Sequence, residues 1–449
     1  MLYKIYGTFF FCLNLLIIQL PAQTVLPAVD TVYGKNIRTV QFADVLDGQG
    51  DVIITLKSDE TLKLHFDDLD ADLKNYAYTV EQCDRDWKPS RLDKIEYLEA
   101  LESDRIRQYV NAQATNIQFT NYRVEIPNDV IRFSKSGNYM LHVYIDNSEK
   151  TPVLSRRFVI SEPVVVVTSI PSAASAIYFN THHDIHFQID PKTFRIQNPM
   201  NDIRSTVLQN GRWDNAYIAG TPEYVIGDKI MYDQIDSLLF PAGREWRYVD
   251  VRSTRYRSER VNRIIQGEDS WEFLLVPDLD RSRQPYIFYP DLNGRFFIET
   301  LDYNQGAISV IGGNSNSTTL PVPTPSNTVN NQAQSDYVNT FFSFKKAEIE
   351  NKDVYIFGAL TDWKLDERFK LKYDENAGVY KINVYLKQGF YNYAYVTVPK
   401  AEKKFDLSEL EGDWYATQND YTIIVYHRPF GARYDRVIGV LKFTSQPRR

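Results

Sequence analysis

Hydrophobic and polar residues alternate with a period of two along many short segments of this chain. In the stretch SGNYMLHVYID, for example, Tyr139, Leu141, Val143 and Ile145 fall on one side of an extended backbone. The segments NYAYTVEQ, NYRVEIPND and HFQID show the same alternation, and helical periodicity is hard to find anywhere. Strict alternation is typical of half-buried strands. The pattern therefore predicts an all-β protein built of tandem antiparallel β-sandwich domains of the immunoglobulin-like (Ig-like) kind.

Breaks in the alternation predict five parts along the chain. A segment at 312–335 is rich in Asn, Ser, Thr and Pro and has no apolar period, which is typical of a linker. The predicted parts are a signal peptide at 1–22, an N-terminal β-sandwich at 28–162, a second β-rich domain at 163–311, the linker, and a C-terminal Ig-like early-set β-sandwich at 336–449.

The N-terminus has the pattern of a secretory signal. Lys4 supplies a positive charge, an apolar run follows from Phe9 to Leu20, and Ala22 offers a small residue for cleavage. No later uncharged stretch reaches the roughly 20 residues that span a bilayer. We therefore expect an exported, periplasmic chain without direct membrane insertion.

The stretch VYLKQGFYNYAYV places Tyr391, Tyr393 and Tyr395 on one side of an extended segment. Such a row of rings could form a sugar platform, a docking surface or one half of a sandwich core. Each strand of a sandwich needs one apolar face, so we expect a core position, with a tight turn at 387–389 joining two paired strands.

Composition and motifs give little indication of catalysis or of nucleic-acid, cofactor or metal binding. The formal net charge is −7, with acidic and basic residues mixed along the chain, so no nucleic-acid surface is expected. Phosphate-binding loops, nucleophile elbows and zinc-binding motifs are missing from the sequence, so we expect no enzyme, no catalytic residues, no cofactor and no metal. The segment THHDIH could hold a metal through His182, Asp184 and His186, although a polar strand edge is the simpler interpretation. The acidic pair Asp67 and Asp68 is expected to be solvated.

The C-terminal third resembles the early-set Ig-like modules that include glycogen-binding domains. The resemblance is carried by YIFGALTDWKLDERFKLKYDENAGVYKINVYLKQGFYNYAYV. In sugar-binding members, exposed Trp rings stack on glucose faces, so the resemblance makes Trp363 and Trp414 candidate carbohydrate-binding residues. A periplasmic carbohydrate-binding protein is therefore the alternative function.

The chain as a whole resembles the plug protein family of the type IX secretion system of Bacteroidetes. The segments that carry the resemblance include YAYTVEQCDRDWKPSRLDKIEYLEA, LLFPAGREWRYVDVRS, YPDLNGRFFIE and WYATQNDYTIIVYHRPFGARYDRVIGV. The resemblance implies a non-enzymatic periplasmic protein, peripherally associated with the outer-membrane complex. Its implied partner is the giant outer-membrane β-barrel translocon, whose periplasmic mouth it would plug when no substrate is in transit.

Three short motifs combine charge with aromatic or turn residues and are candidates for partner binding. They lie in QNGRW, GREWR and DLNGR. A structural interpretation competes with this one, because Asn-Gly pairs form hairpin turns and Arg and Trp pack over strand faces. The candidate residues are Arg212, Trp213, Arg244, Trp246, Asp291, Asn293 and Arg295.

Overall fold

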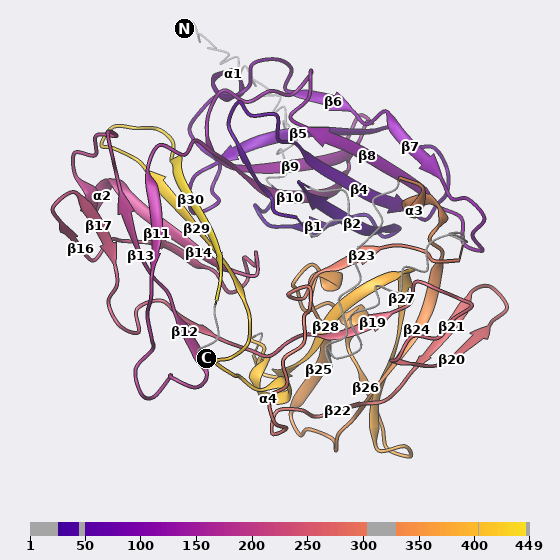
Figure 1. Ribbon diagram of the computed structural model, residues 1–449. Coiled ribbons are helices and arrows are strands. Elements are labelled where there is room, and N and C mark those ends of the chain that lie inside the picture. The colour runs from indigo at the N-terminus through magenta and orange to yellow at the C-terminus, as the bar shows by residue number, and fades with distance from the viewer. Residues whose placement is uncertain (1–25, 45–49, 303–328, 403, 446–449) are drawn as a thin grey trace, which may run out of the picture.

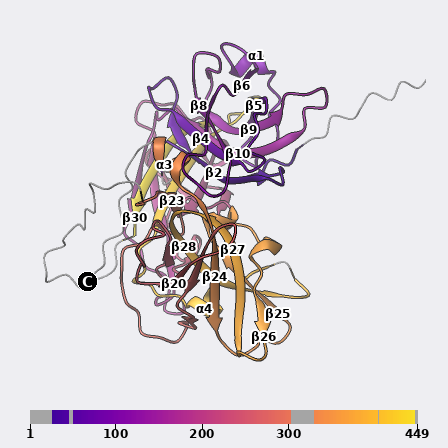
Figure 2. The ribbon, with the colours of Figure 1, turned by 90° about the vertical axis from the view of Figure 1, so that its right-hand side faces the viewer.

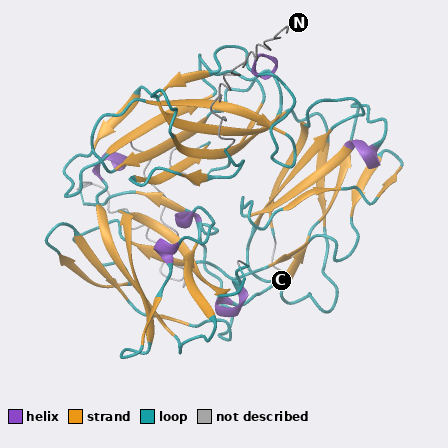
Figure 3. Cartoon of the chain, turned by 180° about the vertical axis from the view of Figure 1, so that it is seen from behind, coloured by secondary structure: helices purple, strands orange, loops and turns teal. Residues whose placement is uncertain are grey.

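The computed structural model describes residues 26–44, 50–302, 329–402 and 404–445. The predicted signal peptide, residues 1–22, lies outside the described residues. Strands dominate the described chain and form several mainly antiparallel sheets, which confirms the predicted all-β sandwich fold. The sheets gather in three lobes that lie at the corners of a triangle (Figures 1 and 3).

The first lobe, residues 26–163, is a sandwich of two sheets with a single buried core between them. One sheet has the order β1 (Thr31–Val32), β10 (Pro152–Ser161), β9 (Gly137–Ile145), β5 (Tyr76–Cys83) and β6 (Ser103–Arg105), and β3 (Ile53–Thr55) also pairs with β10. The facing sheet has the order β2 (Ile37–Ala43), β4 (Leu62–Asp68), β8 (Thr120–Ile126) and β7 (Gln108–Asn111). The short helix α1 (Lys94–Tyr97) buries its last residue against this core.

The second lobe combines residues 164–242 with residues 415–445. One sheet has the order β11 (Val166–Ile170), β13 (His186–Asp190), β17 (Lys229–Tyr232) and β16 (Tyr224–Ile226). The other has the order β15 (Tyr217–Gly220), β14 (Ile203–Gln209), β29 (Asp420–His427) and β30 (Arg436–Thr444). A small ribbon of β12 (His182–Asp184) and β18 (Leu239–Pro241) and the helix α2 (Pro199–Asp202) complete the lobe.

The third lobe combines residues 243–302 with residues 329–414. One sheet has the order β19 (Arg247–Asp250), β28 (Gly389–Pro399) and β23 (Phe296–Ile298), and β25 (Lys352–Phe357) also pairs with β28. The other has the order β20 (Val261–Gln266), β21 (Trp271–Leu275), β24 (Tyr337–Lys345), β27 (Val379–Lys387) and β26 (Lys372–Asp374), with β22 (Asp278–Leu279) beside β24. Its short helices are α3 (Val329–Gln334), α4 (Ser408–Glu411), η1 (Ala359–Thr361) and η2 (Glu367–Phe369).

The lobes depart from the predicted domains beyond the first. The first lobe corresponds closely to the predicted sandwich at 28–162, but the strands of the predicted domain at 163–311 divide between the second and third lobes. The predicted domain at 336–449 loses β29 and β30 to the second lobe, where Ile203 lies opposite His427. Alternation within a strand shows which residues face a core, but it does not show which sheet the strand joins, and this is why the boundaries were misplaced.

The predicted linker at 312–335 also needs a correction at its end. Residues 303–328 lie outside the described residues, but 329–334 form helix α3. Asn331, Gln332 and Ala333 are buried, and the helix lies between the first and third lobes (Figure 2). The end of the polar segment is therefore part of a packed interface.

The tyrosine row belongs to the core of the third lobe, as predicted. Tyr391, Tyr393 and Tyr395 are at most 3% exposed. The predicted turn between paired strands is wrong, because β27 and β28 lie in opposite sheets and buried Gln388 carries the chain across. Each strand still needs one apolar face in this arrangement, so the alternation is the same for a crossing as for a hairpin.

None of the helices in the described ranges has the length and apolar character needed to cross a membrane.

Candidate interface at the junction of the three lobes

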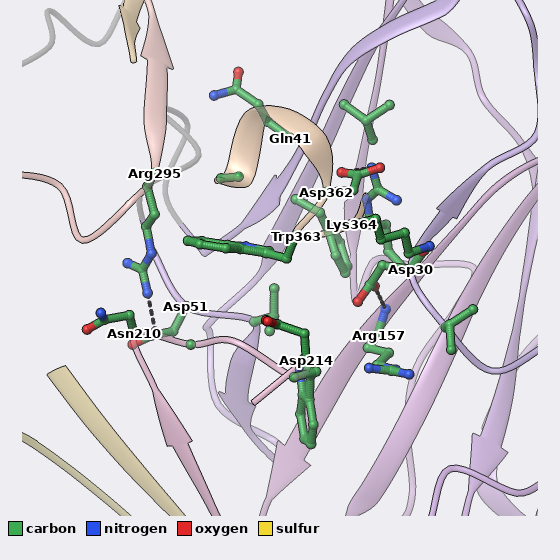
Figure 4. Close-up of a pocket in the computed structure, with 18 of the residues that line it drawn as sticks. Asp30, Gln41, Asp51, Arg157, Asn210, Asp214, Arg295, Asp362, Trp363 and Lys364 are labelled. Carbon is green, nitrogen blue, oxygen red and sulfur yellow. Dashed lines mark hydrogen bonds and ion pairs between the residues drawn. The ribbon is translucent and has the colours of Figure 1, made fainter. Parts of the chain in front are cut away.

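Most of the residues singled out in the sequence meet where the three lobes join. A cavity of about 340 Å³ lies at this junction and is lined by residues of all three lobes. Figure 4 shows Trp363 in the middle of the cavity, with Arg295 on one side and Asp362 and Lys364 on the other. We call this region the three-lobe junction.

Two Asn-Gly turns bring the second and third lobes together at the junction. Asn210 and Asn293 have φ angles of 58° and 52°, and the glycine after each is also left-handed, as type I′ turns require. The Asn293 Nδ2 donates to Asp420 Oδ2 at 2.8 Å, and the Asp420 backbone N–H donates to Asn210 Oδ1 at 2.9 Å. Asp420 therefore connects the two turns, which supports the structural interpretation of these Asn-Gly pairs.

Arg212 extends from the first of these turns into a cage of aromatic rings. Its guanidinium lies 6.0, 5.2 and 5.0 Å from the ring centroids of Trp246, Phe357 and Trp363, which all belong to the third lobe. The carboxylate of Asp214 pairs with it at 2.6 Å. The side chain is buried, so these cation–π contacts act in a partly desolvated setting, where each is worth up to about 2 kcal/mol. Arg212 thus fastens the second lobe to the third.

Trp363 adopts a backbone conformation that is rare for a bulky residue. Its φ is 57°, and the preceding Asp362 has φ 53°. Such left-handed residues cost about 1–3 kcal/mol each and persist only where their surroundings compensate. The compensation comes from packing, because the ring meets Trp246 edge-on at 5.5 Å and lies so close to Gly294 that no Cβ would fit there.

Ionic contacts close the junction on the side of the first lobe. The Arg156 guanidinium lies 3.0 Å from the Asp362 carboxylate, and the Lys364 ammonium donates to the backbone carbonyl of Asp30. Asp51 of the first lobe is shared, since Lys442 of the second lobe lies 2.7 Å from it and Arg295 of the third lobe lies 3.6 Å from it. One carboxylate thus contacts cations from both other lobes.

Trp213 packs at the contact between the first and second lobes. It meets Trp87 edge-on at 4.8 Å, and the guanidinium of Arg157 lies within 5.6 Å of both rings. Buried residues from both lobes, including Cys83 and Tyr426, continue this contact in one apolar cluster. The Tyr426 hydroxyl donates to Asn138 Oδ1 at 3.0 Å. Sheets of the two lobes therefore pack face to face.

The first and third lobes share a completely buried ion pair. The ammonium of Lys387 on β27 lies 2.6 Å from the carboxylate of Asp67 on β4, and neither side chain is exposed. The Tyr337 hydroxyl donates to the same carboxylate at 2.7 Å, and the Lys387 ammonium lies 4.0 Å from the centre of the Phe119 ring. The expectation that Asp67 and Asp68 are solvated is wrong, because both carboxylates are buried. The third lobe covers Asp67 on the outer face of β4, while Asp68 is buried within the first lobe, where it pairs with Lys74 and accepts from the Tyr76 hydroxyl.

The remaining predicted residues lie on the third-lobe side of the junction. Arg244 is buried and donates to the carbonyls of Arg281, Gln284 and Pro285, and its guanidinium lies 5.9 Å from the Trp414 ring. Asp291 accepts from the backbone N–H groups of Trp246 and Asn293. Burial raises the pKa of Asp291 to about 7.

The junction therefore gathers the residues predicted for partner binding, but it buries several of them. Arg212, Arg244 and Trp246 are 4–7% exposed, so they offer a partner almost no surface. Arg212 and Trp246 hold the second lobe against the third, while the contacts of Arg244 stay within the third lobe. Their role in partner binding stays a prediction. Sequence reasoning missed Asp51, Arg156 and Lys387, because their partners lie in lobes far away along the chain.

The acidic and histidine clusters are engaged within the protein. His186 Nε2 lies 3.0 Å from Asp184 Oδ2, while His182 Nδ1 lies 2.8 Å from the Thr181 hydroxyl. Within the described ranges, the group with spacing suited to a metal is Asp68, Asp70 and Asp72. The ammonium of Lys74 pairs with all three of those carboxylates and so already provides positive charge there.

Comparison with solved structures shows a relative of the same overall architecture. The crystal structure of a hypothetical protein from Parabacteroides merdae has 32% sequence identity and a TM-score of 0.82, and the match covers 94% of this chain and 100% of that one. The three-lobe arrangement therefore extends over the whole of that relative. Among curated proteins, none matches this sequence.

Residues 37–162, nearly the whole first lobe, match the family described as "Type 9 secretion system plug protein 1st domain". The chain belongs to the type IX secretion system plug protein family. Membership gives this family member a role related to type IX secretion and a place in the cell envelope. The match ends at the boundary between the first and second lobes, so the family's first domain corresponds to this sandwich without its short edge strand β1.

Two further solved structures align only weakly with this chain. They are a fragment of alpha-2-macroglobulin from Escherichia coli and a marsupial T cell receptor, with 9% and 8% identity. The alignments cover 43% and 91% of this chain, and 97% and 100% of those chains. The TM-scores of 0.12 and 0.16 are too low to indicate a shared fold.

Proposed function

We propose that this protein closes the periplasmic mouth of the outer-membrane translocon of the type IX secretion system when no cargo is in transit. Membership in the plug protein family supports the proposal. A pore wide enough to pass folded proteins leaks unless a body of comparable width covers it. The closing body must also keep its shape when it binds and leaves, since a flexible chain would pay an ordering cost on every cycle.

The observation that carries the proposal is the locking of three sandwiches into one broad body. Each pair of lobes has its own buried contact: Lys387 with Asp67, Arg212 with Trp363, and Tyr426 with Asn138. Two lobes connected by an open linker would move independently, because interfaces between domains are commonly small and polar. Three interlocked lobes instead form a wide, rigid unit, as a plug requires.

The proposed role is non-enzymatic. The carboxylate of Glu411, whose pKa is strongly lowered, is engaged in structure: burial would raise its pKa, but ion pairs with Arg247 and Arg281 lower it to about 2. Two core hydroxyls, those of Tyr393 and Tyr395, both donate to Asp278. These groups are satisfied by neighbours that hold the third lobe together, so the proposal assigns them no chemistry.

The carbohydrate-binding alternative has less support from the geometry. A sugar stacks on an open ring face. The guanidinium of Arg212 lies over the Trp363 ring, and that of Arg244 lies over the Trp414 ring, where Tyr286 also packs at 6.0 Å. The rings suggested for sugar stacking therefore already have partners within the protein.

The experiment that tests the proposal is co-purification with a tagged translocon from cells with normal and with depleted cargo. We expect this protein to co-purify, and more of it when cargo is depleted. Plug and cargo compete for one mouth, so each lowers the apparent affinity of the other by the same factor. Failure to co-purify in either state would contradict the proposal.

A further inference from the structure

The loop that joins β19 to β20 on the third lobe presents an Arg-Tyr-Arg sequence to solvent. Arg255, Tyr256 and Arg257 are all exposed, and the exposed fraction of Tyr256 is 69%. Arg263 on the neighbouring strand β20 is exposed as well, and the Arg257 guanidinium donates to the carbonyl of Asn262 beside it at 2.7 Å. We call Arg255, Tyr256, Arg257 and Arg263 the arginine tip. None of these four residues lines the cavity at the three-lobe junction.

Both ends of this loop are anchored in the third lobe. At its start, the Ser253 hydroxyl donates to the buried carboxylate of Asp302 at 2.8 Å. The same hydroxyl oxygen accepts from the backbone N–H groups of Arg255 and Tyr256, both at 3.1 Å. At its end, the Ser258 hydroxyl donates to the carbonyl of the last residue of β19 at 2.8 Å. These bonds fix the backbone that carries the exposed side chains, and such pre-organisation lowers the cost of binding.

The three guanidiniums of the arginine tip have no carboxylate partner within the described ranges, where the bond from Arg257 to a backbone carbonyl is their one side-chain hydrogen bond. The exposed carboxylate of the loop, that of Glu259, accepts from the Tyr248 hydroxyl at 2.7 Å. Each unpaired guanidinium offers N–H donors in a fork that fits a carboxylate. A partner that covers the tip must therefore supply acceptors, because buried donors without acceptors are costly.

Other carboxylates nearby do not neutralise the surface of the tip. Those beneath the loop are bound by deeper arginines or by hydroxyl groups, and they are Asp250, Asp278, Glu299 and Asp302. The acidic turn at residues 267–272 lies at the other end of β20, where the Glu272 carboxylate lies beside Gly267. Arg263 and Gly267 are about 13 Å apart along an extended strand, which exceeds the Debye length of about 8 Å at physiological ionic strength. The exposed charges of the tip and its loop are therefore three guanidiniums and one carboxylate.

We infer that the arginine tip binds an acidic segment on the periplasmic side of the translocon, whose carboxylates pair with the three guanidiniums around the ring of Tyr256. The inference rests on the proposed function for the identity of the partner. Arg and Tyr are enriched among the residues that dominate binding at protein–protein contacts, and complementary charge speeds the encounter. An anionic membrane surface fits less well, because the formal net charge of −7 on the whole chain opposes its approach.

The test compares two double charge reversals in the full-length protein by capture on tagged translocon. The tip variant carries Arg255→Glu and Arg257→Glu, and the control carries Arg91→Glu and Arg132→Glu at exposed positions of the first lobe. All four side chains are exposed, so both variants should unfold at the same temperature as the wild-type protein. The tip variant should bind the translocon at least tenfold more weakly, while the control should keep the wild-type affinity.

Two further measurements separate a charged contact from a general effect of the substitutions. Tyr256→Ser leaves every charge in place and should lower the apparent affinity severalfold, because the exposed ring lies between the two arginines. Raising the salt concentration from about 50 to about 300 mM should weaken the binding of the wild-type protein more than that of the tip variant, since salt screens exposed charges.

The outcomes separate the inference from the proposed function. If the wild-type protein itself is not captured, the proposed function fails. If the wild-type protein and the tip variant are captured equally, or the tip variant and the control lose affinity equally, the proposed function stands and the inference about the tip is overturned. The inference is also overturned if the wild-type protein floats with vesicles of phosphatidylethanolamine and phosphatidylglycerol and the tip variant does not, because the partner would then be lipid.

Discussion

The ammonium of Lys387 lies 2.6 Å from the carboxylate of Asp67, and both side chains are completely buried between the first and third lobes. Burial lowers the pKa of Lys387 despite this carboxylate. The two residues are 320 positions apart in the sequence. A buried pair of this kind is expensive to break, because the partner that remains is an uncompensated charge.

Asp67→Asn should therefore destabilise the protein strongly. We expect a loss of about 3–5 kcal/mol in the free energy of unfolding, since the Lys387 ammonium would lose its carboxylate while still buried. Asp190→Asn is the matched control, because Asp190 pairs with an ammonium that is 57% exposed, and exposed pairs contribute about 0–1 kcal/mol. Urea denaturation of both variants measures the difference, and equal effects would contradict the account of this interface.

Gly294→Ala should destabilise the three-lobe junction. Gly294 has φ 83°, and an added Cβ would lie 2.5 Å from Trp363 Cη2 and 2.9 Å from the Trp246 ring. Gly378→Ala controls for the backbone, because Gly378 has φ 63° and nothing within 4 Å of the added Cβ. Both variants pay about 1–2 kcal/mol for the left-handed conformation, and only Gly294→Ala adds about 1–3 kcal/mol for the clash. Thermal unfolding of the two proteins should differ accordingly; similar melting temperatures would show that the rings move aside freely.

His65 should make the protein less stable in mild acid. Burial, followed by the charges of Arg123 and Lys387, lowers its pKa from 6.5 to about 3. The folded state thus keeps the ring neutral between pH 6.5 and about 3, while the unfolded chain binds a proton. Stability is therefore lost as the pH falls through this window, by at most about 1.4 kcal/mol per pH unit for this group.

His65→Leu should remove that part of the pH dependence. We expect the variant to gain stability relative to the wild-type protein as the pH falls from 7.5 to 5, because leucine has no proton to exclude. Urea denaturation across this range measures the gain. Parallel loss of stability in the two proteins would show that His65 does not control the acid response.

Alternation in the sequence predicts the inward faces of the strands well. On β4, Leu62, Leu64 and Phe66 lie in the core of the first lobe as the pattern requires. The same pattern places His65 and Asp67 on the outer face, but it does not reveal that another lobe covers this face. The burial of both residues depends on a partner strand more than 300 positions away, which local alternation does not encode.

Strand β29 is a second case in which the sequence pattern does not identify the neighbouring elements. Ile423 and Val425 face the core of the second lobe, while Ile424 and Tyr426 face the contact with the first lobe. A strand buried on both faces has a continuous apolar run, which identifies it as a strand but does not identify its neighbours. The same limit applies to the candidate site. The sequence identified Trp213, Trp246 and Trp363 as candidate binding residues, but their positions at the three-lobe junction depend on how the lobes pack.

The most direct test of the central claim is the permeability of the outer membrane in cells that lack this protein. A deletion strain should admit a large glycopeptide antibiotic that the intact envelope excludes, while cargo export continues, and wild-type protein supplied in trans should restore exclusion. A deletion strain that stops exporting cargo and remains impermeable would contradict the plug account.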